Sequence, residues 1–191
     1  AQVEAAKKQF KGFELPGRTL GVIGLGAIGV KVSNAAHDLD MRVLGYDPKI
    51  TVENAWRLNA AIEQAVSVDD LFSRSQFISV HVPLLDATRH LVNAERLALM
   101  KKPGVILNFA RGEIVDEAAV LAALDSGQLA AYVCDFPSQR LNAHPKVIAL
   151  PHLGASTAEA EDNCAAMVAD QIREYLEVGN VRNSVNFPEA N

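Results

Sequence analysis

The feature that most constrains this chain is a glycine-rich hexapeptide, Gly24-Leu-Gly26-Ala-Ile-Gly29. It follows Thr19–Gly24, an apolar run that predicts a strand buried on both faces. It opens Ala27–Leu39, whose apolar residues recur at helical spacing. A strand, a G-x-G-x-x-G turn and a helix in this order are typical of folds that bind a dinucleotide.

The spacing of the three glycines has a physical reason. Gly24 is expected to permit the tight turn, Gly26 to let the backbone approach a diphosphate, and Gly29 to let the helix pack on the strand. The N–H groups at the start of the helix, near Ala27, would then face the phosphates. A purely structural glycine turn also fits this short pattern, so the motif alone leaves both interpretations open.

Asp47 strengthens the dinucleotide interpretation, because it ends a second predicted strand, Arg42–Tyr46. A carboxylate at this position is expected to accept both ribose hydroxyls of NAD and to disfavour the 2′-phosphate of NADP. The alternative is that Asp47-Pro48 only forms a turn that ends the strand.

The rest of the chain alternates short β-rich runs with helical patterns, which predicts an α/β fold with a Rossmann-type, doubly wound parallel sheet. Further strands are expected over 76–80, 105–108, 131–134 and 147–150, and helices over 68–74, 93–100, 116–125 and from a capping box at Ser156–Glu159 to about Val178. We divide the chain into a connecting helix (1–14), the Rossmann domain (15–157), a C-terminal helix (158–180) and an extended linker (181–191). The terminal helices would connect to a substrate domain for which this chain has no room, so we expect the chain to be a fragment.

Composition excludes some classes of function. The net charge of −5 argues against nucleic-acid binding. No apolar run reaches the roughly 18–20 residues that span a bilayer, and the N-terminus lacks the apolar core of a signal peptide. Cys134 and Cys164 form neither a disulfide framework nor a metal-binding spacing, and we expect both to be small buried residues in a reducing cytoplasm.

Three later segments each place a charged or titratable side chain just past a predicted strand: Arg111, Asp135 and His152. A single such residue would usually be structural, as an ion pair, a turn cap or a loop histidine. Because the carboxyl ends of parallel strands converge on one ligand site, we expect the three to act together.

With these segments in view, the chain resembles the D-2-hydroxyacid dehydrogenases, and within that family the D-3-phosphoglycerate dehydrogenases. The resemblance covers nearly the whole chain. It is carried by LPGRTLGVIGLGAIG (15–29), HVPL (81–84), MKKPGVILNFARGEIVDE (100–117) and PHLGAST (151–157). The closing RNSVNFP (182–188) resembles the linker before a C-terminal regulatory domain.

The resemblance implies a role for each residue. Arg111 would hold the substrate carboxylate and polarise its carbonyl, His152 would be the general acid and base, and Asp135 would lie beside the nicotinamide. His37, His81, His90 and His144 lack a comparable setting and are expected to be structural, and no metal is expected. The implied NAD-binding residues are Gly24, Gly26, Ala27, Ile28, Gly29, Asp47, Val82, Pro83, Phe109, Ala110, Arg111, Asp135, His152, Leu153, Gly154 and Ala155.

One segment departs from the family. Where the family has D-V-F-x-x-E-P, whose Glu pairs with the histidine, this chain has a shorter D-F-P-S-Q-R with Gln139 at the matching position. A glutamine oxygen can still accept the ring N–H of His152, but it contributes no charge to stabilise the imidazolium. An alternative is that Gln139 points away and another group orients the ring.

The resemblance therefore implies NAD-dependent oxidation of 3-phospho-D-glycerate to 3-phosphooxypyruvate in serine synthesis. Without the resemblance, the residues themselves indicate only hydride transfer on a small 2-hydroxy or 2-oxo acid. The alternatives are a relative acting on glycerate, glyoxylate, lactate or formate, and a non-catalytic NAD-sensing protein; a domain that binds S-adenosylmethionine would not explain Arg111 and His152 together. We expect a homodimer or larger homo-oligomer, and no turnover by these 191 residues alone.

Overall fold

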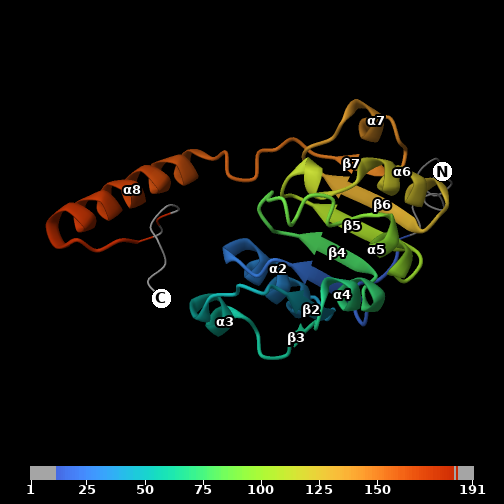
Figure 1. Cartoon of the computed structure of the whole chain (residues 1–191), viewed down its shortest axis with the longest axis horizontal. Helices are drawn as coiled ribbons and strands as arrows, with labels where there is room; N and C mark the ends of the chain where they lie inside the picture. The colour runs from blue at the N-terminus through green and yellow to red at the C-terminus, as the bar shows by residue number, and fades with distance from the viewer. Residues whose placement is uncertain (1–11, 183, 185–191) are drawn as a thin grey trace, which may run out of the picture. The chain divides into compact units, whose positions relative to one another are not determined.

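A seven-stranded parallel sheet organises the computed structural model, which describes residues 12–182 and 184. Its strand order is β3-β2-β1-β4-β5-β6-β7 (Figure 1). The strands are β1 Thr19–Ile23, β2 Arg42–Tyr46, β3 Glu63–Gln64, β4 Phe77–Val80, β5 Gly104–Asn108, β6 Leu129–Cys134 and β7 Val147–Ala149. The winding direction reverses between β1 and β4, and a ligand crevice forms at such a point in doubly wound sheets. The predicted Rossmann-type fold is confirmed.

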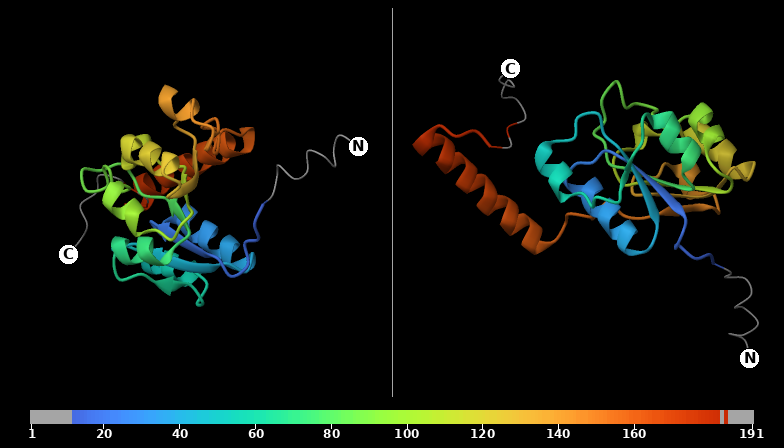
Figure 2. Two further views of the ribbon diagram at one scale, coloured as in Figure 1. Left: turned by 90° about the vertical axis from the view of Figure 1, so that its right-hand side faces the viewer. Right: turned by 90° about the horizontal axis from the view of Figure 1, so that it is seen from below.

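Helices cover both faces of the sheet, as the two views of Figure 2 show. Contacts place α2 (Ala27–Asp38) against β1 and β2 and α6 (Glu117–Asp125) against β6, while α4 (Val68–Arg74), α5 (Ala94–Leu99) and α6 form a row. The shorter elements are α3 (Val52–Arg57), the 3-10 turn η1 (Gly112–Ile114) and α7 (Gln139–Asn142). The sequence did not predict these three helical turns or β3, because each is too short to show a period of its own.

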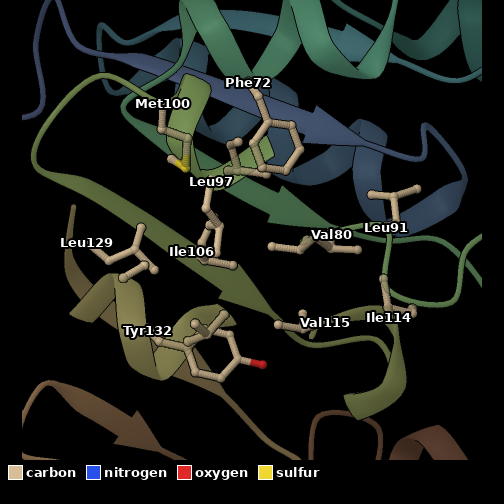
Figure 3. Close-up of a cluster of buried hydrophobic side chains, with 14 of the residues drawn as sticks. Phe72, Val80, Leu91, Leu97, Met100, Ile106, Ile114, Val115, Leu129 and Tyr132 are labelled. Atoms are coloured by element: carbon tan, nitrogen blue, oxygen red, sulfur yellow. The ribbon is translucent and has the colours of Figure 1, made fainter. Parts of the chain in front are cut away.

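Two apolar clusters hold the sheet between its helices. Along β1, Leu20 and Val22 pack with α2, whereas Ile23 belongs to the larger cluster under α4, α5 and α6. This alternation follows from the period of two in a strand, and both faces of β1 are buried as predicted. The larger cluster reaches Tyr132 at the β6 end (Figure 3).

Side-chain caps set where the helices begin. The Ser67 hydroxyl accepts a hydrogen bond from Asp70 N and so caps α4. The C-terminal helix α8 (Ala158–Val178) begins at the predicted residue, but Thr157 rather than Ser156 caps it, by accepting from Ala160 N.

The described residues divide into two compact units, one ending at Pro151 and one beginning at His152. The second contains α8, which ends at Gly179 in the left-handed conformation and has no buried residue. Cys134 is buried as expected, but Cys164 is exposed on α8, so that part of the expectation is wrong. Within the described part of the chain, no helix has the length and apolar character needed to cross a membrane. Most of the predicted connecting helix (1–14) and linker (181–191) lies outside the described residues.

A buried serine on α2 should limit stability. Among the residues that the structure describes, Ser33 Oγ finds no hydrogen-bond partner, although its residue is 0% exposed. We expect Ser33→Ala to raise the free energy of unfolding by up to about 1 kcal/mol, because burying an unpaired hydroxyl is unfavourable.

The matched control is Ser67→Ala, which removes a hydroxyl that does cap a helix and should cost about 1 kcal/mol. Urea denaturation of both variants measures the difference. A loss of stability in Ser33→Ala equal to that in the control would contradict the prediction.

Candidate functional site

The glycine turn has the conformation that its spacing predicts. Gly24 has φ +91°, which favours glycine, and its N–H donates to the carbonyl of Tyr46 over 2.9 Å. A Cβ on Gly29 would lie 1.9 Å from the Gly24 carbonyl oxygen, so only glycine lets α2 approach this closely. A Cβ on Gly26 would meet no atom within 4 Å, so its backbone faces open space.

A cavity of 330 Å³ is lined by this turn and the first turn of α2. The first turn of α2 contains no acidic residue, so its exposed N–H groups present a positive end to the cavity. The cavity gathers nine of the residues implied for NAD: Gly26, Ala27, Ile28, Gly29, Val82, Pro83, Phe109, Ala110 and Arg111.

Asp47 lies at the tip of β2 and ties two loops to the strand. Its Oδ2 accepts from Leu25 N in the glycine turn, and its Oδ1 accepts from Lys49 N, both over 2.8 Å. Each carboxylate oxygen can accept a further hydrogen bond, so these contacts leave capacity for a ribose. Asp47 also lines a separate cavity of 210 Å³, walled mainly by Leu25, Ile50, Leu58 and Ile62.

The loop that carries Arg111 is closed by Asn108, the last residue of β5. Asn108 is 2% exposed; its Oδ1 accepts from Ala110 N over 3.1 Å and its Nδ2 donates to the Arg111 carbonyl over 3.0 Å. The Nδ2 also lies 3.3 Å from the buried Tyr132 hydroxyl. Sequence reasoning missed Asn108, although a buried amide at a strand tip is itself a signal of a fixed loop.

Arg111 borders two cavities at once. It lines the cavity that begins at α2 and a larger one of 600 Å³, whose polar lining includes Glu113, Glu117 and Ser138. The guanidinium donates through Nη1 to the Ala110 carbonyl over 2.7 Å and lies over the ring of Phe136. The positively charged guanidinium of Arg111 is therefore held at the rim of the sheet, beside the 330 Å³ cavity.

His81, which the sequence led us to expect as structural, also lines the 330 Å³ cavity. Its Nε2 shares a hydrogen bond of 2.8 Å with Ser79 Oγ. Burial lowers the pKa of the imidazole below its ordinary value of 6.5. His81 directly follows β4, just as Asp135 directly follows β6.

The remaining predicted residues lie apart from these cavities or in the second unit. Asp135 is half-buried directly after β6, one residue past Cys134, which pairs with Asn108. Gln139 is exposed in the first turn of α7 and lines neither of the cavities that Arg111 borders. The segment His152–Ala155 begins the second compact unit and is exposed.

Two glycine substitutions separate packing from ligand binding. Gly29→Ala should lower the free energy of unfolding by at least about 2 kcal/mol, because its Cβ would collide with a backbone oxygen. Gly26→Ala should leave stability nearly unchanged but weaken NAD binding, because its Cβ would point into the space assigned to the diphosphate.

Calorimetry gives both quantities for each variant. Unchanged NAD affinity in a folded Gly26→Ala protein would argue against a diphosphate at this turn.

The His81 imidazole should titrate below pH 6.5 in an NMR pH series. Because its pKa is lower in the folded chain than in the unfolded chain, its contribution to stability is present above about pH 6.5 and is lost as the pH falls through the folded-state value. His81→Gln should remove this acid-side loss. A midpoint at or above 6.5 would contradict the assignment.

Comparison with known proteins agrees with this geometry. The family model of the D-isomer specific 2-hydroxyacid dehydrogenase, NAD binding domain, matches residues 1–154. The D-3-phosphoglycerate dehydrogenase of Methanocaldococcus jannaschii is 42% identical over 188 residues, which are 95% of this chain and 36% of that protein. The protein of the same name from Synechocystis is also 42% identical, over 95% of this chain and 33% of its own length.

A solved structure of NAD⁺-bound 3-phosphoglycerate dehydrogenase from Entamoeba histolytica superimposes with a TM-score of 0.79 and 32% identity, covering 93% of this chain and 57% of that one. The chain thus spans about a third of the length of the curated relatives that it matches. The matched domain, the parallel sheet and the glycine turn lead to one conclusion: the chain belongs to the D-isomer-specific 2-hydroxyacid dehydrogenases, as their NAD-binding domain.

Proposed function

We propose that the intact protein oxidises 3-phospho-D-glycerate to 3-phosphooxypyruvate with NAD, and that this chain is its cofactor domain. The observation that carries the proposal is the single cavity that joins the first turn of α2 to Arg111. A diphosphate requires the positive helix end, and a 2-hydroxy acid requires a cation nearby. The choice of this acid within the family is supported by relatives named D-3-phosphoglycerate dehydrogenase.

The residues of the cavity fit NAD. Gly26 leaves open space where a diphosphate would approach the backbone, and the Asp47 carboxylate lies beside the same turn through its contact with Leu25 N. The 210 Å³ cavity next to Asp47 has apolar walls suited to the flat face of an adenine. A carboxylate at this place would repel a 2′-phosphate, so we propose NAD rather than NADP.

In this proposal the chain's own residues bind the substrate and move one proton. Arg111 binds the carboxylate of the acid through two N–H groups and keeps the C2 carbon near the cavity. His152 accepts the proton of the C2 hydroxyl as the C–H bond breaks, and returns it in the reverse direction. NAD, when bound, accepts the hydride, so that the products are the 2-oxo acid, NADH and one proton.

Gln139 bears on the protonation step. It stands where the family resemblance implies a glutamate, and it lies exposed in the first turn of α7. We propose that it contributes at most a neutral hydrogen bond to His152, so that the imidazolium is stabilised less than with a carboxylate partner. Gln139→Glu should then move the acidic limb of the pH–rate profile of the intact enzyme.

The rest of the protein is part of the proposal. We propose that a substrate domain closes the cavity from water, with Asp135 on the nicotinamide side and Leu153–Ala155 covering the cofactor. The exposed apolar side chains of α8, such as Met167, Ile172 and Leu176, suit packing against a further domain or subunit. We also propose a homodimer, and a reducing cytoplasm is in keeping with the free thiols Cys134 and Cys164.

The test is a substrate panel on the intact protein. We expect NADH formation with 3-phospho-D-glycerate, slower turnover with D-glycerate and D-lactate, and little activity with NADP. Arg111→Lys should lower kcat/KM by at least about tenfold, because the ammonium cannot bind a carboxylate through two N–H groups.

Arg42→Lys, at the opposite end of the sheet, is the matched control and should leave kcat/KM unchanged. The 191-residue chain alone should bind NAD without appreciable turnover. NAD binding by the intact protein without turnover of any acid would favour a sensing role, and full activity in Arg111→Lys would overturn the proposed chemistry.

A further inference from the structure

The side chain of Arg111 rests on an aromatic ring at the rim of the sheet. Its Cζ lies 5.4 Å from the centroid of the Phe136 ring, within the range of a cation–π contact. Phe136 is 39% exposed and both residues line the 600 Å³ cavity, so the pair lies at an accessible surface.

The ring lies in the segment Asp135-Phe-Pro, directly after β6. A Cβ placed on Gly112 would lie 3.7 Å from the Phe136 carbonyl oxygen and 3.8 Å from its Cβ. This segment is therefore packed against the residue that follows Arg111.

Arg111 is held at its main chain by Asn108 and at its guanidinium by Phe136. Asn108 hydrogen-bonds the main chain on either side, at Ala110 N and at the Arg111 carbonyl. Phe136 contacts the guanidinium, at the far end of the side chain. The guanidinium also donates through Nη1 to the Ala110 carbonyl over 2.7 Å, and its remaining N–H groups can bind a carboxylate, two at a time.

We propose that Phe136 is a positioning residue that holds the Arg111 guanidinium ready for the substrate carboxylate. The proposal rests on the proposed function, in which Arg111 binds that carboxylate. An exposed arginine loses rotamer freedom when it binds a ligand, and holding it beforehand reduces that loss. Phe136 thus acts on substrate affinity, without touching the dinucleotide.

The experiment measures KM for 3-phospho-D-glycerate, Kd for NAD and the melting temperature in variants of the intact protein. Phe136→Leu keeps an apolar side chain of similar size but removes the ring, and should raise KM about two- to fivefold. NAD affinity and melting temperature should stay at the wild-type values. Phe136→Tyr keeps the ring and should restore the wild-type KM.

The chain offers a matched control in a second arginine–phenylalanine pair. The Arg18 Cζ lies 4.7 Å from the centroid of the Phe13 ring, away from both cavities that Arg111 borders. Phe13→Leu removes the same kind of contact and should leave KM unchanged, even if the melting temperature falls.

The outcomes separate this proposal from the function on which it rests. An unchanged KM in Phe136→Leu, beside a large loss in Arg111→Lys, would overturn the role of Phe136 alone. A rise in KM matched by equal losses of NAD affinity and melting temperature, or one that Phe136→Tyr fails to reverse, would show that the ring is merely structural. No loss in Arg111→Lys would overturn the proposed function itself.

Discussion

The close contact between Gly29 and the carbonyl of Gly24 is the constraint on which the rest of the site depends. The backbone of Gly29 can approach the Gly24 carbonyl oxygen only because Gly29 lacks a Cβ, which would lie 1.9 Å from that oxygen. The contact seats the first turn of α2 directly on the tip of β1, and it aims the helix N–H groups across the carboxyl ends of the strands. The positions of the cavity, of the Asp47–Leu25 contact and of Arg111 are all described relative to this placement of α2.

Polar side chains at the strand tips turn the neighbouring loops into fixed parts of the site. Asp47 ties the glycine turn to the end of β2, the imidazole of His81 is anchored on Ser79 past β4, and Asn108 closes the loop after β5. Each anchor uses a hydrogen bond that is partly shielded from water, where a lost partner is costly. Because parallel strands end at one edge of the sheet, these loops meet there, and the Asp47–Leu25 contact joins two of them directly.

The sequence predicted the central strands well because β1 and β4 are buried on both faces and read as apolar runs. The bounds of β2 and α4 agree with the prediction. The elements β3 and α7 were not predicted, because two and four residues are too few to show a period. Exposed residues of α3 also give no signal of a buried face.

The residues of the site also fall into two groups, those that sequence motifs predicted and those that they did not. Residues set by the glycine motif and by HVPL and NFAR, such as Gly26, Pro83 and Arg111, meet in one cavity as the motifs implied. Three contacts of the site have no sequence pattern that marks them: the His81 ring with the Ser79 hydroxyl, the Asn108 amide with the nearby backbone, and the Phe136 ring with the Arg111 guanidinium. The first two join residues two or three positions apart, and only the third joins two loops.

We propose that a dinucleotide lies across the strand tips with its diphosphate on the glycine turn. The ¹H–¹⁵N spectrum of this chain during titration with NAD tests this arrangement. We expect the largest amide shifts at Gly26–Ile28, Val82 and Ala110, while Gly104 at the amino end of β5 stays unmoved. Saturable shifts centred on Gly104, with the glycine turn unaffected, would contradict it.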